Sequence, residues 1–231
     1  MEETPNKDEI IIQEEGISLS GEAGGKVPSV KKEILEWVFA ILFAVVITLI
    51  IKFFIFDIVR VDGHSMESTL QNEDKVILWK LGYEPKRQDI IVLDSNYKDR
   101  EAELDRRKEE DGINGFEAFW FELFPPKEYK NYPYIKRVIG LPGDEIDIRD
   151  NKVYVNGEEL NEPYLDEGIA VLPNQLEVPA VVPEGYIFVM GDNRPKSLDS
   201  RSSELGFVPF EAVAGKAVFR ILPFSSFGSI Q

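Results

Sequence analysis

Cysteine is absent from the 231 residues of the chain, and histidine occurs once. Without thiols the protein can form neither disulfides nor thiolate metal sites. A single histidine, His64, cannot supply the paired histidines of an HExxH zinc site, and no acidic stretch has the spacing of a calcium loop. We therefore expect chemistry that uses neither a metal nor another cofactor.

Basic residues are also scarce. The chain has 26 lysines and arginines against 42 aspartates and glutamates, a formal net charge of -16, and the acidic excess is spread over most of its length. Proteins that bind nucleic acid neutralise phosphates with clustered basic side chains. The composition therefore excludes nucleic acid as a partner. The length of the chain suits one main folded unit beside any membrane segment.

One long apolar run is present at residues 37–57, after a polar and acidic tail that we expect to be disordered over residues 1–36. A helix that crosses the hydrocarbon core needs roughly 20 apolar residues, which this run supplies. A cleaved secretory signal is disfavoured by the acidic segment ahead of the run, and a buried core helix by apolarity on every helix face. The run is therefore predicted to be a single retained transmembrane anchor.

The orientation of this anchor is predicted from the basic residues around it. More of them precede the span than lie at or beyond its end: Lys26, Lys31 and Lys32 against Lys52 and Arg60. The positive-inside rule then gives a slight preference for a cytoplasmic N-terminus. Residues 58–231 are accordingly predicted to form an extracytoplasmic domain.

Short β-like runs follow the anchor, and several alternate between apolar and polar side chains. Asp150 and Asn151 separate two such runs and tolerate a positive φ, so they predict a hairpin turn. The fold class is therefore predicted as mainly β, an antiparallel domain behind one transmembrane helix. The runs are KVILW (75–79), DIIVLD (89–94), YIKRVIG (134–140), DEIDIRD (144–150), KVYVNG (152–157), YIFVMGD (186–192) and GKAVFRIL (215–222).

A helical insertion interrupts this pattern over residues 95–133. Its first part, YKDREAELDRRKEE, carries opposite charges at helical spacing, such as Glu103 and Arg107, which favours a solvated helix. A second helix is predicted to begin at Asn114, which is placed to cap it with Glu117 three residues on. One face of that helix is apolar and consists of Phe116, Phe119, Trp120, Leu123 and Phe124.

Three kinds of contact could cover this aromatic face. We favour packing on the protein's own sheet, because an apolar face at this spacing is usually part of a core. An interfacial helix lying on a bilayer is the first alternative, since Phe and Trp suit the headgroup boundary. A docking surface for a partner protein is the second.

Ser65 is the candidate nucleophile, and it stands beside His64 in the stretch VDGHSMESTL. A serine hydroxyl needs a positioned base, and adjacent side chains of an extended segment point to opposite faces, which disfavours His64 as that base. A lysine can act as this base if an apolar environment keeps its amine neutral. In YIKRVIG, strand alternation puts Lys136 and Arg137 on opposite faces, so one of these cations is predicted to lie among apolar neighbours. A surface lysine on an edge strand is the alternative.

A turn-rich loop, GDNRPKSLDSR at 191–201, directly follows an apolar strand. It concentrates carboxylate, guanidinium, amide and hydroxyl groups in a few residues. Such a loop can brace a site through charge-assisted hydrogen bonds, although an exposed loop of the same composition is the alternative.

Together these segments resemble type I signal peptidase, a membrane-bound serine protease that removes signal peptides from exported proteins. The order matches as well: an anchor, then GHSMESTL, then YIKRVIGLPGD, then GDNRPKSLDSR followed by GFVP. The resemblance covers the anchor and nearly all of residues 58–223. It implies an antiparallel β catalytic core with a smaller β-rich subdomain at residues 145–185, an active site on the outer face of the membrane, and preprotein substrates with small residues at the first and third positions before the cut.

The resemblance also implies roles for individual residues. Ser65 looks like the nucleophile, with its backbone N–H as one arm of the oxyanion hole, and Lys136 looks like the general base of an acyl-enzyme mechanism. Ser197 resembles the serine that orients the lysine, and Asp199 and Arg201 resemble the pair that braces the loop. The substrate cleft would include Gly63, Met66 and Tyr134.

Two departures from the family pattern lie near the nucleophile. The family's SMxPTL reads SMESTL here, so Ser68 replaces a proline that fixes φ, and a looser turn is expected. Gly63 stands where some members have a serine that assists the oxyanion hole, which implies a backbone-only donor or a closer approach of the substrate. Two other functions stay open: a membrane-tethered Ser-Lys protease similar to the self-cleaving repressor proteases, and a non-catalytic signal-peptide-binding module.

Overall fold

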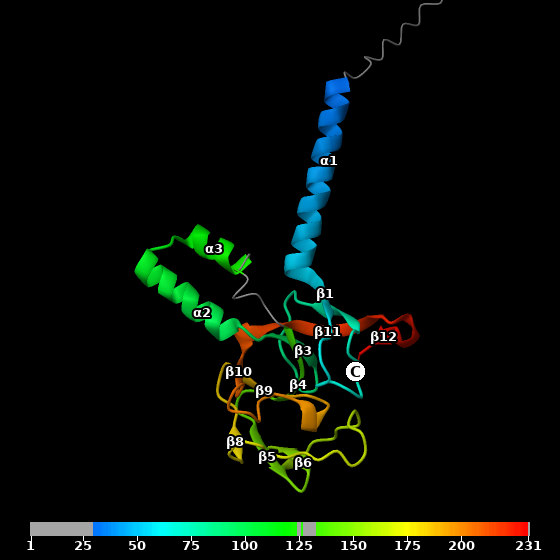
Figure 1. The fold of residues 1–231 in the computed structure, drawn as a ribbon, viewed down its shortest axis with the longest axis vertical. Helices are drawn as coiled ribbons and strands as arrows, with labels where there is room; N and C mark the ends of the chain where they lie inside the picture. The colour runs from blue at the N-terminus through cyan, green and yellow to red at the C-terminus, as the bar shows by residue number, and fades with distance from the viewer. Residues whose placement is uncertain (1–29, 124–125, 127–132, 231) are drawn as a thin grey trace, which may run out of the picture. The chain divides into compact units, whose positions relative to one another are not determined.

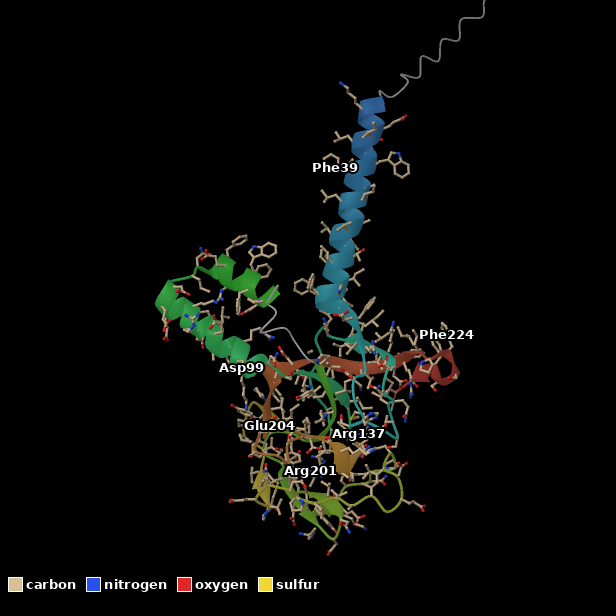
Figure 2. All side chains as sticks on the ribbon, in the orientation of Figure 1. Phe39, Asp99, Arg137, Arg201, Glu204 and Phe224 are labelled. Carbon is tan, nitrogen blue, oxygen red and sulfur yellow. The ribbon has the colours of Figure 1, made fainter. Side chains whose placement is uncertain are left out.

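The computed structural model describes residues 30–123, 126 and 133–230. The chain divides into two compact units, residues 1–45 and 46–231. Helix α1 (Val30–Ile50) is followed by a π-helical segment, η1 (Ile51–Ile55). In the described part of the chain, one helical stretch, Lys31–Ile55, is long and apolar enough to cross a membrane, and its most apolar window has a mean hydropathy of 2.9 with no buried residue. Exposed Phe39 on α1 illustrates this apolar surface (Figure 2).

The end of the apolar run is not helical. Phe56 and Asp57, which fall inside the predicted span of 37–57, are the first residues of strand β1 (Phe56–Arg60). Asp57 forms an ion pair with Lys80 at 3.4 Å, and the backbone of β1 pairs with strand β2 (Lys75–Trp79). The helix therefore stops where the chain begins to exchange hydrogen bonds with a neighbouring strand.

The larger sheet has eight strands in the order β1-β2-β11-β3-β4-β9-β10, with β12 paired to β11 (Figure 1). Every neighbouring pair is antiparallel, which confirms the predicted fold class. Strand β11, the last but one in the chain order of the described strands, lies between β2 and β3, so strands that are distant in the sequence meet in one sheet. The remaining bounds are β3 (Ile90–Asp94), β4 (Pro133–Gly140), β9 (Tyr186–Met190), β10 (Val208–Pro209), β11 (Val213–Leu222) and β12 (Gly228–Ser229).

A second sheet of four strands has the order β7-β6-β5-β8 and lies within residues 145–181. Its first two strands form the predicted hairpin: Arg149 pairs with Lys152, and Asp150 and Asn151 both have positive φ, at 52° and 60°. The bounds are β5 (Glu145–Arg149), β6 (Lys152–Val155), β7 (Glu158–Glu159) and β8 (Ala180–Val181). Short 3-10 turns lie at η4 (Arg194–Lys196), η5 (Phe210–Ala212) and η6 (Phe224–Ser226).

Strand β3 is buried along its whole length and separates two parts of the core. Ile90 and Val92 belong to one apolar cluster, while Ile91 and Leu93 belong to another, as the alternation of a strand requires. The neighbouring strand β4 is covered on both faces in the same way, and its last six residues are buried. Any charged group on β4 therefore lies in the interior.

The insertion contains the two predicted helices, α2 (Tyr97–Arg106), extended by η2 (Arg107–Asp111), and α3 (Gly115–Leu123). The predicted charge pair is present, with Arg107 donating to Glu103 at 2.8 Å. The predicted cap of α3 is present as well: Asn114 Oδ1 accepts from the backbone N–H groups of Phe116 and Glu117, and the Glu117 carboxylate accepts from Asn114 N.

We favoured packing of the aromatic face of α3 on the protein's own sheet. This prediction is wrong for the three residues of that face whose side chains the structure describes. Phe116, Phe119 and Trp120 are 69%, 49% and 44% exposed, and their rings contact one another. Phe121 is buried instead, with the Arg107 guanidinium 4.8 Å from its ring centre. The short turn after η2 thus directs a different face of α3 inward. The other two members of the predicted face, the Leu123 side chain and Phe124, lie outside the described residues.

Candidate active site

Ser65 lies in the segment of residues 61–74 that connects β1 to β2, which we call the nucleophile turn. The two ends of the turn are joined by hydrogen bonds from Val61 N to Asp74 O at 2.8 Å and from Glu73 N to Val61 O at 2.9 Å. Met66 and Leu70 are 1% and 0% exposed and anchor the turn in the apolar core. The partly buried Ser65 is thereby held on a segment that the side chains of Met66 and Leu70 anchor by packing.

Lys136 comes from β4, between β3 and β9, and it is 3% exposed. Its Nζ donates to Ser65 Oγ at 2.8 Å and to the carbonyl of Ile135 at 3.0 Å. The ring of Tyr134, two residues earlier on the same strand, has its centre 5.4 Å from Nζ. The structure thus places the serine and the lysine that the sequence singled out within hydrogen-bond distance.

Burial sets the protonation behaviour of this lysine. It lowers the pKa of Lys136 from 10.5 to about 8, while the carboxylates of Asp199 and Asp192 act in the opposite direction. Desolvation dominates because a charged ammonium loses its hydration in the interior. With a pKa near 8, the neutral amine that can accept a proton is present to a useful extent near neutral pH.

The loop at 191–201 is braced from inside by Asp199 and Arg201. Both residues are nearly inaccessible to solvent, and two parallel hydrogen bonds of 2.8 Å join the guanidinium to the carboxylate. Asp199 also accepts from Gly191 N at 3.0 Å, and Arg201 donates to the carbonyl of Arg194 at 2.7 Å. Such a bidentate pair fixes both ends of the loop. Arg201 is labelled in Figure 2.

Ser197 lies close to the dyad, but its hydroxyl is not bonded to Lys136. Within the described residues, Ser197 Oγ is buried and has no hydrogen-bond partner. Gly191 packs so closely that a side chain there would meet both Ser197 and the carbonyl of Ser65. The loop of Ser197 is therefore in direct contact with the nucleophile turn.

His64 faces Glu67 instead of the nucleophile. Its Nδ1 lies 2.5 Å from Glu67 Oε1, and its side chain is 59% exposed. Ser65 Oγ is meanwhile contacted by the buried lysine. The geometry therefore favours Lys136 over His64 as the group that receives the serine proton.

One pair next to the site escaped the sequence reasoning. Arg137 is 1% exposed and donates to Asp192 at 2.9 and 2.7 Å, and its guanidinium lies 3.7 Å from the ring centre of Tyr164. Asp192 also accepts from Thr69 Oγ1, four residues after the nucleophile. Strand alternation places Arg137 on a face with apolar residues. A buried arginine requires a carboxylate partner. The 191–201 loop is rich in carboxylates, so the sequence could have indicated this loop as the source of that partner.

Ser68 adopts a conformation that the family's proline could not. Its φ is 83°, and its hydroxyl donates to the carbonyl of Tyr164 at 3.0 Å. A proline ring fixes φ near -65°. The turn is therefore built differently from a proline turn and is held by a side-chain hydrogen bond.

This difference leads to a stability prediction. We expect Ser68→Pro to destabilise the domain by more than about 1 kcal/mol, because the ring and the native φ are incompatible. Ser68→Gly should cost less, since glycine tolerates a positive φ. Thermal unfolding of both variants beside the wild type measures the difference, and a Ser68→Pro protein as stable as the wild type would show that the turn readily adopts the proline geometry.

No group of three or more residues that could ligate a metal is present in the part of the chain that the structure describes. The site itself presents the hydroxyl of Ser65 and the amine of Lys136 at 2.8 Å. This arrangement matches what a Ser-Lys hydrolase needs: a nucleophile, a base of lowered pKa and nearby donors.

Comparison with known proteins identifies the family. Residues 34–222 match the family described as signal peptidase, peptidase S26. The chain belongs to this family. It is 35% identical over 204 residues to signal peptidase I of Bacillus licheniformis, covering 84% of this chain and 92% of that protein, and 36% identical over 208 residues to signal peptidase I S of Bacillus subtilis (strain 168), covering 85% and 94%. A crystal structure of a signal peptidase I from Enterococcus faecalis V583 is 29% identical with a TM-score of 0.38, covering 58% of this chain and 97% of that one.

Membership of the family settles the class of reaction. The protein is a signal peptidase, a serine endopeptidase that hydrolyses peptide bonds and acts on the signal peptides of preproteins. The resemblance noted in the sequence is therefore confirmed at the level of family and enzyme class.

Proposed function

We propose that the protein removes signal peptides by a Ser-Lys dyad mechanism in which Ser65 is the nucleophile and Lys136 is the general base. The observation that carries the proposal is the 2.8 Å contact between Ser65 Oγ and the Nζ of a lysine that is 3% exposed. A lysine that is shielded from water on a central strand can be neutral when the substrate binds. A serine beside it can then be deprotonated as it attacks.

The steps follow from this geometry. Neutral Lys136 takes the proton from Ser65 Oγ as the oxygen attacks the scissile carbonyl, and a tetrahedral intermediate forms. The lysine then gives the proton to the departing amine of the mature protein, which leaves an ester between Ser65 and the signal peptide. Water, deprotonated by the same lysine, hydrolyses the ester and restores the serine.

The negative oxygen of the intermediate needs donors that are fixed before the reaction. The backbone N–H of Ser65 is the donor that we assign, because the turn is anchored on both sides of the serine by Val61 and Met66. Gly63 has a φ of 98°, and a Cβ there would meet nothing within 4 Å, so substrate could approach the backbone closely on that side. A donor of this kind contributes about 2.7–4 kcal/mol of transition-state stabilisation in a comparable hydrolase.

We further propose that Ser197, Asp199 and Arg201 support the dyad, and that Gly63, Met66 and Tyr134 border the substrate cleft. Met66 is buried under the turn, so it would shape the cleft floor and not its surface. The Tyr134 ring covers the lysine from β4. The orienting role of Ser197 would require its free hydroxyl to turn toward Lys136 when substrate binds.

The proposal also includes a membrane tether. The apolar stretch Lys31–Ile55 would span the bilayer, with the N-terminus in the cytoplasm and the catalytic domain on the outer face. Substrates would be exported preproteins with small residues at the first and third positions before the cut. An extended substrate could add to a strand edge while shallow pockets accept only small side chains.

The substrate prediction can be tested without altering the enzyme. Purified full-length protein in detergent should cut a precursor after an Ala-x-Ala sequence, and a precursor with a bulky residue in place of the final alanine should be cut at least roughly tenfold more slowly, because a methyl-sized pocket cannot accept the larger group. Mass spectrometry of the products locates the cut. Cleavage of the enzyme alone would favour the self-cleaving protease, and an intact precursor bound to the enzyme would favour the binding module.

A further inference from the structure

Glu67 follows the nucleophile by two residues and connects the nucleophile turn to the 191–201 loop. Its Oε2 accepts a hydrogen bond from Asn193 Nδ2 at 3.0 Å. The backbone N–H of the same asparagine donates to the carbonyl of Ser65 at 3.0 Å. Asn193 therefore holds the turn at two points, once at Ser65 itself and once at the Glu67 side chain.

The other groups around this carboxylate keep it in place. His64 Nδ1 lies 2.5 Å from Oε1, and Lys196 Nζ lies 3.6 Å from Oε2. The hydrogen bond from His64 and the charge of Lys196 hold the pKa of Glu67 below its ordinary value. The side chain is thus an anion with partners on both oxygens, so it is occupied as a structural link instead of being free to contact substrate.

The nucleophile turn and the 191–201 loop are closely packed as well as hydrogen-bonded. Gly191 lies directly against the carbonyl of Ser65 and the side chain of Ser197, with no room for a methyl group. The turn is joined to this loop by the hydrogen bonds from Asn193 N to Ser65 O and from Thr69 Oγ1 to Asp192. The hydrogen bond from Asn193 Nδ2 to Glu67 adds a link at the residue between these two attachment points and limits movement of the turn there.

We propose that Glu67 is a positioning residue: by holding Asn193, it fixes the nucleophile turn against the loop of Ser197 so that Ser65 stays aligned with Lys136. The inference rests on the proposed Ser65–Lys136 mechanism. Because misalignment of about 1 Å at a reacting atom can cost roughly 100-fold, a partial loosening should lower kcat and leave KM nearly unchanged.

The test is a double-mutant cycle with one precursor. We expect Glu67→Ala and Asn193→Ala each to lower kcat by roughly five- to twentyfold, with KM changed less than about twofold, because each removes the same charge-assisted hydrogen bond. The double variant should be no slower than the slower single variant. Glu67→Gln should recover most of the activity, because its amide oxygen can still accept from Asn193 Nδ2.

Controls separate this inference from its alternatives. Glu159→Ala, which removes an exposed glutamate paired with Lys152, should leave kcat unchanged. The inference is overturned if the two single effects multiply in the double variant, if Glu67→Ala cuts like the wild type, or if its kcat falls only in proportion to the folded fraction seen in thermal unfolding. A wild-type protein that leaves the precursor intact would instead overturn the proposed function.

Discussion

Lys136→Ala is expected to lower the turnover of a precursor by roughly 10²–10⁴-fold, the contribution of a positioned general base. The Nζ that contacts Ser65 Oγ is the only base that the geometry offers the serine among the described residues, since His64 faces Glu67. Lys136→Arg should be as inactive as the alanine variant, because a guanidinium does not give up its proton in a protein. Initial rates of precursor cleavage measure both effects.

The same lysine predicts the pH dependence of the wild type. Only the neutral amine accepts a proton, and its pKa is lowered to about 8. The value of kcat/KM should therefore rise as the pH increases toward 8 and level off above it. Lys152→Ala, at an exposed lysine paired with Glu159, is the matched control and should keep both rate and profile. A flat profile with chemistry rate-limiting, or an active Lys136→Ala protein, would show that another group is the base.

Gly191→Ala is expected to be nearly as damaging, with a loss of at least roughly 100-fold in kcat. A Cβ at this position would lie 2.6 Å from Ser197 Cβ and even closer to Ser197 Oγ and the Ser65 carbonyl. A backbone carbonyl cannot rotate away as a long side chain can. The methyl group would therefore push the nucleophile turn and the 191–201 loop apart, even though the backbone of Gly191 has no positive φ that alanine would resist.

Kinetics and thermal unfolding together test this steric explanation. Gly115→Ala is the matched control, because a Cβ at Gly115 meets nothing within 4 Å and its φ is not positive. That variant should keep its activity and its unfolding midpoint. A Gly191→Ala enzyme with wild-type kcat would mean that the two segments can separate without disturbing Ser65, and the close packing would then carry no catalytic role.

Local patterns predicted the local structure well. The charge pair of Glu103 and Arg107, the cap at Asn114 and the hairpin at Asp150 and Asn151 depend on residues only a few positions apart, and all three are present. The contact between Ser65 and Lys136 was also anticipated, but from an ordered set of motifs and not from spacing. Strand alternation predicted that either Lys136 or Arg137 is buried, and both are buried in the structure.

The features that escaped prediction depend on tertiary contacts. The aromatic face of α3 has the spacing of a core helix, yet the turn after η2 directs Phe121 inward and leaves Phe116 exposed. The partner of Arg137 is Asp192, 55 residues later, and no local rule connects them. The φ of Ser68 is set by a hydrogen bond to Tyr164, which is remote in the sequence.

Strand β11 connects the part of the sheet next to Ser65 with the part that carries Lys136. Ser65 follows β1 and precedes β2, whereas Lys136 lies on β4 beside β3, and β11 is the strand that joins β2 to β3. Residues 213–222 must therefore leave the ribosome before the two halves of the sheet can close around the dyad. A pairing between segments so distant in sequence forms late, because a long loop must first be closed. A growing chain that lacks β11 is therefore expected to have no protease activity.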